Sequence, residues 1–314
     1  MRAVALDQYG DPRELAVREV DEPKVGPDTV LVRTAAASIN PVDYKIAQGL
    51  LDGRFPVLWP LVLGWDVAGE VVGLGPAVRG LEVGQRVVGY ARKDHLGGGT
   101  WAELVGVPAR GVVPAPERLD DVASSCLPLA GLTAWQSLVE VLEVGTGDTV
   151  LVHAATGGVG HLAVQIARSR GASVIGTCSG RNTAYLRSLG AEAVEYGEGF
   201  EDRVRGLAPD GVDAVLDLVG GEALTASPGL LRAASAGRLV SVVDADTVRS
   251  LGGTYVFVRP DAGQLAELTR LADAGELVPE VQSVHPLDDV RVAVSQARAG
   301  VRGKVVLTCE GAQG

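Results

Sequence analysis

The residues of this chain best suited to chemistry form a glycine-rich turn, Ala-Ala-Thr-Gly-Gly-Val-Gly, at positions 154–160. The turn follows an apolar run over residues 149–153, and no aspartate or glutamate occurs between Asp148 and Glu192. Glycines allow a backbone to approach a pyrophosphate closely, and a helix expected from about Gly158 onward points its free amide groups at that anion. The turn therefore predicts a site for a phosphorylated nucleotide.

The same three glycines could form an ordinary tight turn, so the surrounding sequence decides between the two interpretations. An amphipathic helix containing Leu162 and Ile166 follows the glycines, and a second apolar strand ends at Cys178. A strand, a glycine turn, a helix and a second strand in succession are typical of a dinucleotide-binding unit. The context favours nucleotide binding.

The residues after the second strand indicate which dinucleotide is bound. An NAD-specific site usually places a carboxylate there for the ribose hydroxyls, whereas this chain has Ser179-Gly-Arg-Asn182. The Ser179 hydroxyl and the Arg181 guanidinium suit a 2′-phosphate, which an aspartate would repel. Arg181 could instead be an ordinary residue in the first turn of a helix. We expect NADPH rather than NADH.

Other kinds of chemistry have little support in the sequence. The histidines (positions 95, 153, 161 and 285) are scattered, and the cysteines (126, 178 and 309) lack ligand spacing, so no zinc is expected. No Gly-x-Ser-x-Gly elbow is present, which argues against a serine hydrolase. His153 is either a strand-end residue that lines the nucleotide cleft or a buried core histidine.

Composition limits the class of protein. The 314 residues suit two domains, and 46% hydrophobic residues supply sizeable cores. A net charge of −11 and a pI near 4.9 argue against nucleic acid or an anionic membrane as partner and favour small molecules. The scattered cysteines, an N-terminus that turns polar early and the lack of an apolar run of about 20 residues predict a cytoplasmic protein.

The pattern of the chain changes along its length. Residues 1–121 carry short β-rich runs over 30–34, 66–72 and 85–90, as expected for a compact β-rich domain. The following residues alternate strands and helices, which predicts a parallel sheet with helices on both faces. The expected elements are helices over 132–143, 159–170, 183–189 and 224–233, and strands over 150–153, 173–178, 214–217 and 238–243.

The last segment of the chain, residues 303–308, is again β-rich and looks like a strand that completes the N-terminal sheet. The strand-helix region is then an insertion. We therefore expect a catalytic domain from residues 1–121 and 258–314, and a nucleotide-binding domain from residues 122–257.

Several further motifs accompany the glycine turn. They are Ile39-Asn-Pro-Val-Asp-Tyr-Lys45, Leu63-Gly-Trp-Asp-Val-Ala-Gly-Glu70, Leu127-Pro-Leu-Ala-Gly-Leu-Thr-Ala134, Val212-Asp-Ala-Val-Leu-Asp217 with Gly220-Gly221, and Arg302-Gly-Lys-Val-Val306. Through these motifs the whole chain resembles the zinc-independent quinone oxidoreductases (ζ-crystallin type) of the medium-chain dehydrogenase/reductase superfamily. The resemblance implies an α/β fold with a doubly wound Rossmann domain inserted into a GroES-like β-barrel domain. It also implies reduction of substrate between the domains and a homodimer or homotetramer.

The resemblance also concerns metal and substrate. Zinc-dependent relatives have a cysteine ligand at the place of Ser38 and a Gly-His-Glu sequence at the place of Gly64-Trp-Asp66, so the resemblance implies the branch without metal. Some quinone-reducing relatives carry a substrate-facing tyrosine where this chain has Leu50 and Leu51. That departure leaves the acceptor and the proton donor open.

Site residues follow from the resemblance position by position. The catalytic candidates are Asn40, Tyr44, Lys45 and Trp65, with Asp66 beside them, and all except Asn40 could equally be packing or hinge residues. The cofactor contacts are expected at the nicotinamide end (Asn40, Thr133, Val219, Val243, Tyr255, Phe257 and Val258), the pyrophosphate (Thr156, Gly157, Gly158 and Val159) and the 2′-phosphate (Ser179, Arg181 and Tyr196).

The expected reaction is hydride transfer from NADPH to a quinone or to the β-carbon of an α,β-unsaturated carbonyl compound, with a proton then supplied by solvent or a side chain. An alternative is an enoyl reductase dedicated to a biosynthetic intermediate, such as a polyketide-like group or an acyl thioester. A third hypothesis, from another class, is a non-catalytic NADPH-binding protein.

Overall fold

The computed structural model describes residues 1–309, which form two compact units. The first contains Met1–Leu132 and the chain from Arg259 onward, and the second contains Thr133–Val258. Helix α2 (Asp121–Ser124) packs against strands of the first unit, so the contacts place the division eleven residues after the predicted boundary at 121/122. Among the residues described, no helix is both long and apolar enough to cross a bilayer.

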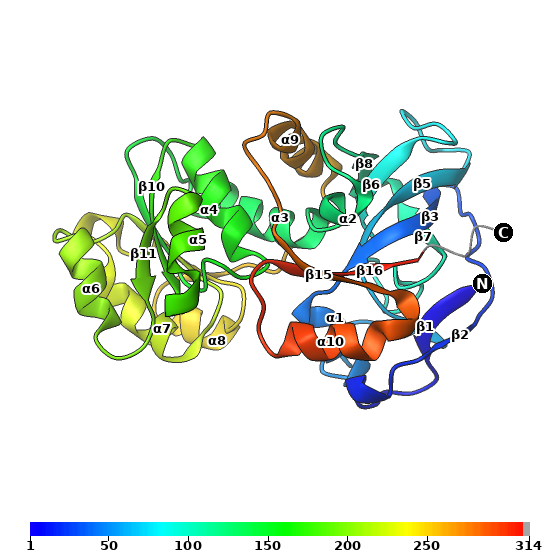
Figure 1. Ribbon diagram of the computed structural model, residues 1–314, viewed down its shortest axis with the longest axis horizontal. Coiled ribbons are helices and arrows are strands. Elements are labelled where there is room, and N and C mark those ends of the chain that lie inside the picture. The colour runs from blue at the N-terminus through cyan, green and yellow to red at the C-terminus, as the bar shows by residue number, and fades with distance from the viewer. Residues whose placement is uncertain (310–314) are drawn as a thin grey trace. The chain divides into compact units, whose positions relative to one another are not determined.

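The second unit is built on a six-stranded parallel sheet (Figure 1). Its strand order is β11-β10-β9-β12-β13-β14, so the direction of winding reverses between β9 and β12. Ligands of such sheets bind outside the carboxyl ends of the strands at this switch point. The strands are β9 (Thr149–Val152), β10 (Ser173–Cys178), β11 (Glu192–Glu195), β12 (Ala214–Asp217), β13 (Leu239–Ser241) and β14 (Thr254–Tyr255).

Helices pack on this sheet because its inner strands are apolar on both faces. Leu151, Val215 and Leu239 are essentially inaccessible to solvent and share one core cluster. The helices are α4 (Gly160–Ser169), α5 (Thr183–Ser188), α6 (Phe200–Leu207), α7 (Gly221–Ala226) and α8 (Ala245–Ser250), while α3 (Pro128–Trp135) begins in the first unit and continues as a π-helical segment, Gln136–Val141.

The first unit contains a mostly antiparallel sheet of seven strands and a smaller sheet of three. The large sheet has the order β15-β16-β3-β5-β6-β8, with β7 also paired to β3, and the small one has the order β2-β1-β4. The strands are β1 (Arg2–Leu6), β2 (Val17–Glu19), β3 (Thr29–Ser38), β4 (Leu61–Val62), β5 (Asp66–Leu74), β6 (Arg86–Tyr90), β7 (Leu104–Pro108), β8 (Val112–Pro114), β15 (Val281–Pro286) and β16 (Lys304–Thr308). The longer helices are α1 (Pro41–Ala47), α9 (Ala262–Asp273) and α10 (Val290–Arg298).

The last strand of the chain joins the first unit, as its sequence predicts. Strand β16 pairs antiparallel with β3, with Val306 opposite Ser38, and parallel with β15. The second unit is therefore inserted between two parts of the first. Figure 1 shows β1, in blue, and β16, in red, both of which belong to the first unit.

Two expected helices differ from the structure, and two further elements were not expected. The helix predicted over 224–233 ends at Ala226, because Pro228 cannot continue it and a 3₁₀ turn follows instead. The helix predicted over 132–143 begins earlier, at Pro128, and changes to π geometry at Gln136. Strand β11 and helix α6 have no counterpart in the prediction, because the four residues of β11 include two glutamates and only one buried side chain.

Candidate functional site

The glycine turn lies at the switch point of the parallel sheet. It connects β9 to α4, and its end at Gly160 has no room for a side chain, because a Cβ atom there would lie 2.2 Å from the Ala154 carbonyl oxygen. The turn is braced from inside by a hydrogen bond between His161 Nδ1 and the Gly157 carbonyl oxygen (2.8 Å). Helix α4 begins two residues later than expected, and no side chain caps it. A helix start without a side-chain cap leaves backbone amides that can bind an anion.

The three residues predicted to bind a 2′-phosphate lie at one edge of this sheet. Ser179 follows β10 and Tyr196 follows β11, and the Tyr196 amide donates to the Cys178 carbonyl oxygen (3.1 Å). Arg181 is exposed, and its guanidinium makes neither an ion pair nor a hydrogen bond with any residue described. The Asn182 side-chain amide donates to the Thr156 hydroxyl (3.2 Å), which ties this edge to the glycine turn.

A buried carboxylate organises the loops on the other side of the switch point. Asp217 ends β12 and accepts hydrogen bonds from the amides of Val219 (3.1 Å) and Gly220 (2.9 Å) and from the Ser241 hydroxyl (2.7 Å). The Ser241 oxygen in turn accepts from the Val243 amide (3.1 Å). Val219 and Val243 are consequently held in exposed positions, about half accessible to solvent. The sequence motif contained Asp217, but reasoning from it missed this role.

The remaining residues predicted for the nicotinamide end differ in exposure. Thr133 is buried in α3, whereas Phe257 is 41% exposed. Tyr255 pairs with Ser241 across β13 and β14, and the Arg249 guanidinium carbon lies 5.9 Å from the centre of its ring. Tyr255 ends β14, and Phe257 and Val258 follow within three residues.

His153 is a core residue rather than part of a cleft lining, so the first of its two interpretations is wrong. It is 1% exposed, packs edge-on against Phe200 and lies within hydrogen-bond distance of the hydroxyls of Thr177 (3.4 Å) and Ser227 (3.1 Å). Burial lowers the pKa of His153 to about 4, so the imidazole is neutral at physiological pH.

The first unit contains a buried polar network centred on Asp66. One carboxylate oxygen accepts from the Ser38 hydroxyl (2.7 Å) and the Asn40 side-chain amide (2.8 Å), and the other accepts from the Leu129 amide (2.8 Å). The Lys304 ammonium lies 3.8 Å from Asp66 and donates to the Asn40 side-chain oxygen. Both polar ends of the Asn40 amide are thus held, which fixes its orientation.

Asp43 adds a second buried carboxyl group to this region. One of its oxygens accepts from the Asn40 backbone amide (2.7 Å), and the other has no hydrogen-bond partner among the residues described. Burial, aided by the charge of Asp66, raises the pKa of Asp43 to about 8. Asp43 is therefore mostly protonated at neutral pH, which avoids a second buried negative charge near Asp66.

Comparison with known proteins places the chain in a family. Residues 26–117 match the family described as alcohol dehydrogenase GroES-like domain, and residues 158–262 match the family described as zinc-binding dehydrogenase. The chain is 31% identical to the chloroplast envelope quinone oxidoreductase homolog of Arabidopsis thaliana, over 98% of both chains. The chain belongs to the quinone oxidoreductase branch of the medium-chain dehydrogenase/reductase superfamily.

Two further likenesses are informative about this superfamily member. The structure of the quinone oxidoreductase from Coxiella burnetii superimposes with a TM-score of 0.87 at 33% identity, over 99% of each chain. The trans-enoyl reductase pgmF of Aspergillus terreus is 41% identical over 176 residues, which cover 54% of this chain and 49% of that one. The expected GroES-like and Rossmann domains are confirmed, and the family binds nicotinamide cofactors.

Ser38 and Trp65 occupy the positions at which the resemblance implies zinc ligands in metal-dependent relatives. Ser38 donates its hydroxyl to Asp66, and Trp65 stands where those relatives have a histidine. Across residues 1–309 no group of three or more His, Cys, Asp or Glu side chains gathers in a metal-binding arrangement. The three cysteines are free and buried.

The structure does not bring the other catalytic candidates into the Asp66 network. Trp65 is 6% exposed and packs edge-on between Phe55 and Tyr90, at centroid distances of 6.5 and 6.0 Å. Tyr44 is half-buried, with the Arg298 guanidinium carbon 5.8 Å from its ring centre, and Lys45 is exposed. Of the leucines at the position of the missing tyrosine, Leu50 is 64% exposed and Leu51 is buried.

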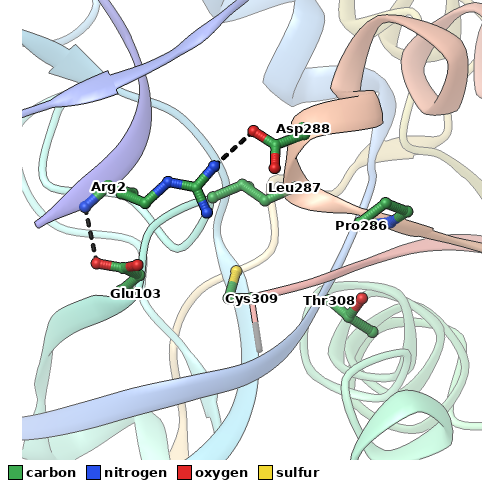
Figure 2. A pocket seen from close by; sticks show the side chains of 7 residues that line it. All are labelled: Arg2, Glu103, Pro286, Leu287, Asp288, Thr308 and Cys309. Carbon is green, nitrogen blue, oxygen red and sulfur yellow. Dashed lines mark hydrogen bonds and ion pairs between the residues drawn. The ribbon is translucent and has the colours of Figure 1, made fainter. Parts of the chain in front are cut away.

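A pocket of about 220 Å³ lies elsewhere in the first unit (Figure 2). Its lining includes Arg2, Glu103, Asp288 and Cys309, and none of the predicted site residues. Arg2 forms an ion pair with Asp288 (2.6 Å) and donates its backbone amide to Glu103 (2.8 Å). Arg2 and Asp288 thus already pair with each other, and burial raises the pKa of the Cys309 thiol to about 12, so the thiol is not ionised at neutral pH.

The buried carboxyl group of Asp43 predicts a pH-dependent stability. Its pKa of about 8 in the folded protein exceeds the value of about 3.9 for an unfolded aspartate, so between these values the folded state binds more protons. This group therefore lowers stability as the pH rises from about 4 to about 8. The free energy of unfolding is measured by urea denaturation at about pH 5 and about pH 8. Between these two pH values it should fall by up to about 3 kcal/mol more in the unaltered protein than in Asp43→Asn. Parallel pH profiles would contradict the assignment.

The close approach at Gly160 predicts a difference between two glycines of the same turn. A Cβ atom at Gly160 collides with backbone, whereas one at Gly157 would make an ordinary 3.4 Å contact with the Ala154 oxygen. Gly160→Ala should lower the unfolding free energy by about 2 kcal/mol, and Gly157→Ala by less than about 1 kcal/mol, measured by denaturation without nucleotide. An equal loss of unfolding free energy in the two variants would contradict the prediction that the close backbone contact at Gly160 sets the cost of a side chain there.

Proposed function

We propose that the protein is an NADPH-dependent, zinc-independent oxidoreductase that transfers hydride to a quinone or to the C=C bond of an α,β-unsaturated carbonyl compound. The observation that carries the cofactor assignment is that Arg181 is exposed and unpaired among the described residues, near Ser179 and Tyr196. The hydrogen bond between Asn182 and Thr156 links this edge of the sheet to the glycine turn before α4. Family membership supports the oxidoreductase activity. The acceptor is proposed from resemblance to quinone oxidoreductases.

The roles proposed for the chain's own residues follow from their positions. Bound NADPH supplies the hydride. The amides at the start of α4, with Thr156 to Val159, bind the pyrophosphate, and Arg181 with Ser179 neutralises the 2′-phosphate. By the same resemblance, Asn40 contacts the nicotinamide ribose and ring. Asp66 and Lys304 fix the orientation of its side chain, so that it can hold the nicotinamide in one position for hydride transfer.

Several other roles are proposed on resemblance alone. Thr133 and the loops at Val219 and Val243, with Tyr255, Phe257 and Val258, contact the nicotinamide half. Hydride addition to an enone leaves negative charge on the carbonyl oxygen, which Tyr44, Lys45 or a solvent proton would then neutralise. A homodimer or homotetramer is proposed on the same basis, and a cytoplasmic location is proposed from the scattered cysteines and the lack of a long apolar run in the sequence.

The second candidate function is an enoyl reductase dedicated to one biosynthetic intermediate. The 41% identity to the trans-enoyl reductase of Aspergillus terreus favours it, although that match covers 54% of this chain. Both candidates use the same cofactor site and hydride step. They differ in the acceptor, so substrate kinetics separate them.

Removing the guanidinium of Arg181 tests the cofactor assignment. Arg181→Ala should raise the KM for NADPH about 10- to 100-fold and change the KM for NADH less than about twofold, because only NADPH carries the 2′-phosphate. Arg170→Ala is a matched control, since Arg170 is exposed at the opposite end of α4 from the glycine turn. Equal effects of Arg181→Ala on the two cofactors would contradict the assignment.

A panel of acceptors tests the reaction. Quinones, short enones, 2-alkenals and acyl thioesters are assayed with NADPH and ranked by kcat/KM, the ratio that measures discrimination. We expect the highest values with a quinone or a short enone. Highest values with acyl thioesters would favour the enoyl reductase. Binding of NADPH, followed by fluorescence, without its oxidation by any acceptor would indicate a non-catalytic binding protein.

A further inference from the structure

The proposed 2′-phosphate edge contains a carboxylate that the sequence reasoning did not single out. Glu195 is the last residue of β11, and its register partner in the parallel sheet is Cys178, the last residue of β10. The next residues on the two strands are Ser179 and Tyr196, both proposed contacts of the phosphate. Glu195 therefore lies in the same row of strand ends, directly before Tyr196 and beside the residue that precedes Ser179 (Figure 1 shows the two adjacent strands).

The side chain of Glu195 is directed at the turn that follows β10. A Cβ atom placed on Gly180 would lie 2.7 Å from one Glu195 carboxylate oxygen and 3.3 Å from the other, so the carboxylate rests against the bare backbone of Gly180. The Glu195 backbone is held from the far side, where its carbonyl oxygen accepts from Arg203 Nη2 (2.8 Å). The next residue after Gly180 is Arg181, whose guanidinium is proposed to bind the phosphate.

The charge of Glu195 is not neutralised within the protein. Its carboxylate makes no ion pair and accepts no hydrogen bond from any residue described, and the same holds for the guanidinium of Arg181. The turn at residues 179–182 thus carries the positive charge of Arg181 and lies against the negative charge of Glu195, and the two charges do not pair with each other. Because neither charge is paired within the protein, each is free to attract or repel charged groups of a ligand that binds at this turn.

We propose that Glu195 is a specificity-determining residue that limits the preference for NADPH over NADH. Its carboxylate suits the ribose 2′-hydroxyl of NADH, which can donate a hydrogen bond to it, and repels the dianionic 2′-phosphate of NADPH that Arg181 attracts. This inference rests on the proposed function, because it assumes that a nicotinamide dinucleotide binds at this edge. The two residues together leave a preference for NADPH that is weaker than Arg181 alone would give.

The test compares Glu195→Gln with Glu192→Gln. Glu192 is also exposed and lies at the opposite end of the same strand, so the control removes the same charge away from the turn. Dissociation constants for NADPH and NADH are measured by fluorescence titration, and kcat/KM is measured for both with the best acceptor. Thermal unfolding of each variant confirms that it is folded.

We expect Glu195→Gln to raise the ratio of kcat/KM for NADPH to that for NADH about tenfold, through tighter NADPH binding and weaker NADH binding, while Glu192→Gln changes it less than about twofold. The increase should shrink at high salt, because solvent ions screen exposed charges. Glu195→Asp, which keeps the charge, should stay near the unaltered ratio.

The outcomes separate this inference from the proposed function. An unchanged ratio in folded Glu195→Gln, with normal binding of both cofactors, would overturn the inference and leave the proposed function standing. Equal changes in Glu195→Gln and Glu192→Gln would also overturn it, because they would reflect net charge rather than position. Failure of the unaltered protein to bind either cofactor would overturn both.

Discussion

Each unit of this protein depends on one buried carboxylate that must be compensated. Moving a carboxylate out of water costs several kcal/mol unless hydrogen bonds or an opposite charge replace the water. Asp66 in the first unit accepts three hydrogen bonds and lies 3.8 Å from Lys304. Asp217 in the second unit accepts from two loop amides and from Ser241. These requirements dictate which segments come together around each carboxylate.

The segments gathered by the two carboxylates are far apart in the chain. Asp66 connects β5 with the end of β3, the start of α1, the start of α3 and the last strand, β16, which contributes Lys304. Asp217 connects the loop after β12 with the loop after β13. These carboxylates also hold residues that the sequence singles out as site candidates. Asp66 holds Asn40, and Asp217 holds Val219 directly and Val243 through Ser241. Asp66, itself a candidate, is a support, because it is fully buried and its oxygens are occupied.

Charge at the proposed cofactor edge illustrates how the pairing of strands changes a conclusion drawn from sequence. The acid-free window ends at Glu192, and within it the turn after β10 carries only Arg181 as a charged group next to Ser179. Strand β11 begins at Glu192 and runs parallel to β10, which carries Glu195 to the end of the sheet and against Gly180. The turn after β10 contains no acidic residue in its own sequence, but the carboxylate of Glu195 lies next to it in the structure. The electrostatic field at the turn comes from both strands.

The sequence by itself determined the features that depend on local pattern. The glycine turn, the strand-helix alternation, the insertion of one unit into the other and the last strand's return to the first sheet follow from glycine spacing and apolar periodicity, which act over a few residues. It did not reveal β11, whose apolar pattern is too short, or the end of α7 at the residues before Pro228.

Only the tertiary structure decided which polar residues support the fold and which are available to a ligand. His153 turned out to be buried and neutral, Asn40 to be fixed by Asp66 and Lys304, and Arg181 to be exposed without a partner. The reason is physical: burial and hydrogen bonding depend on neighbours brought from distant parts of the chain. A side chain's own type and its sequence spacing do not specify those neighbours.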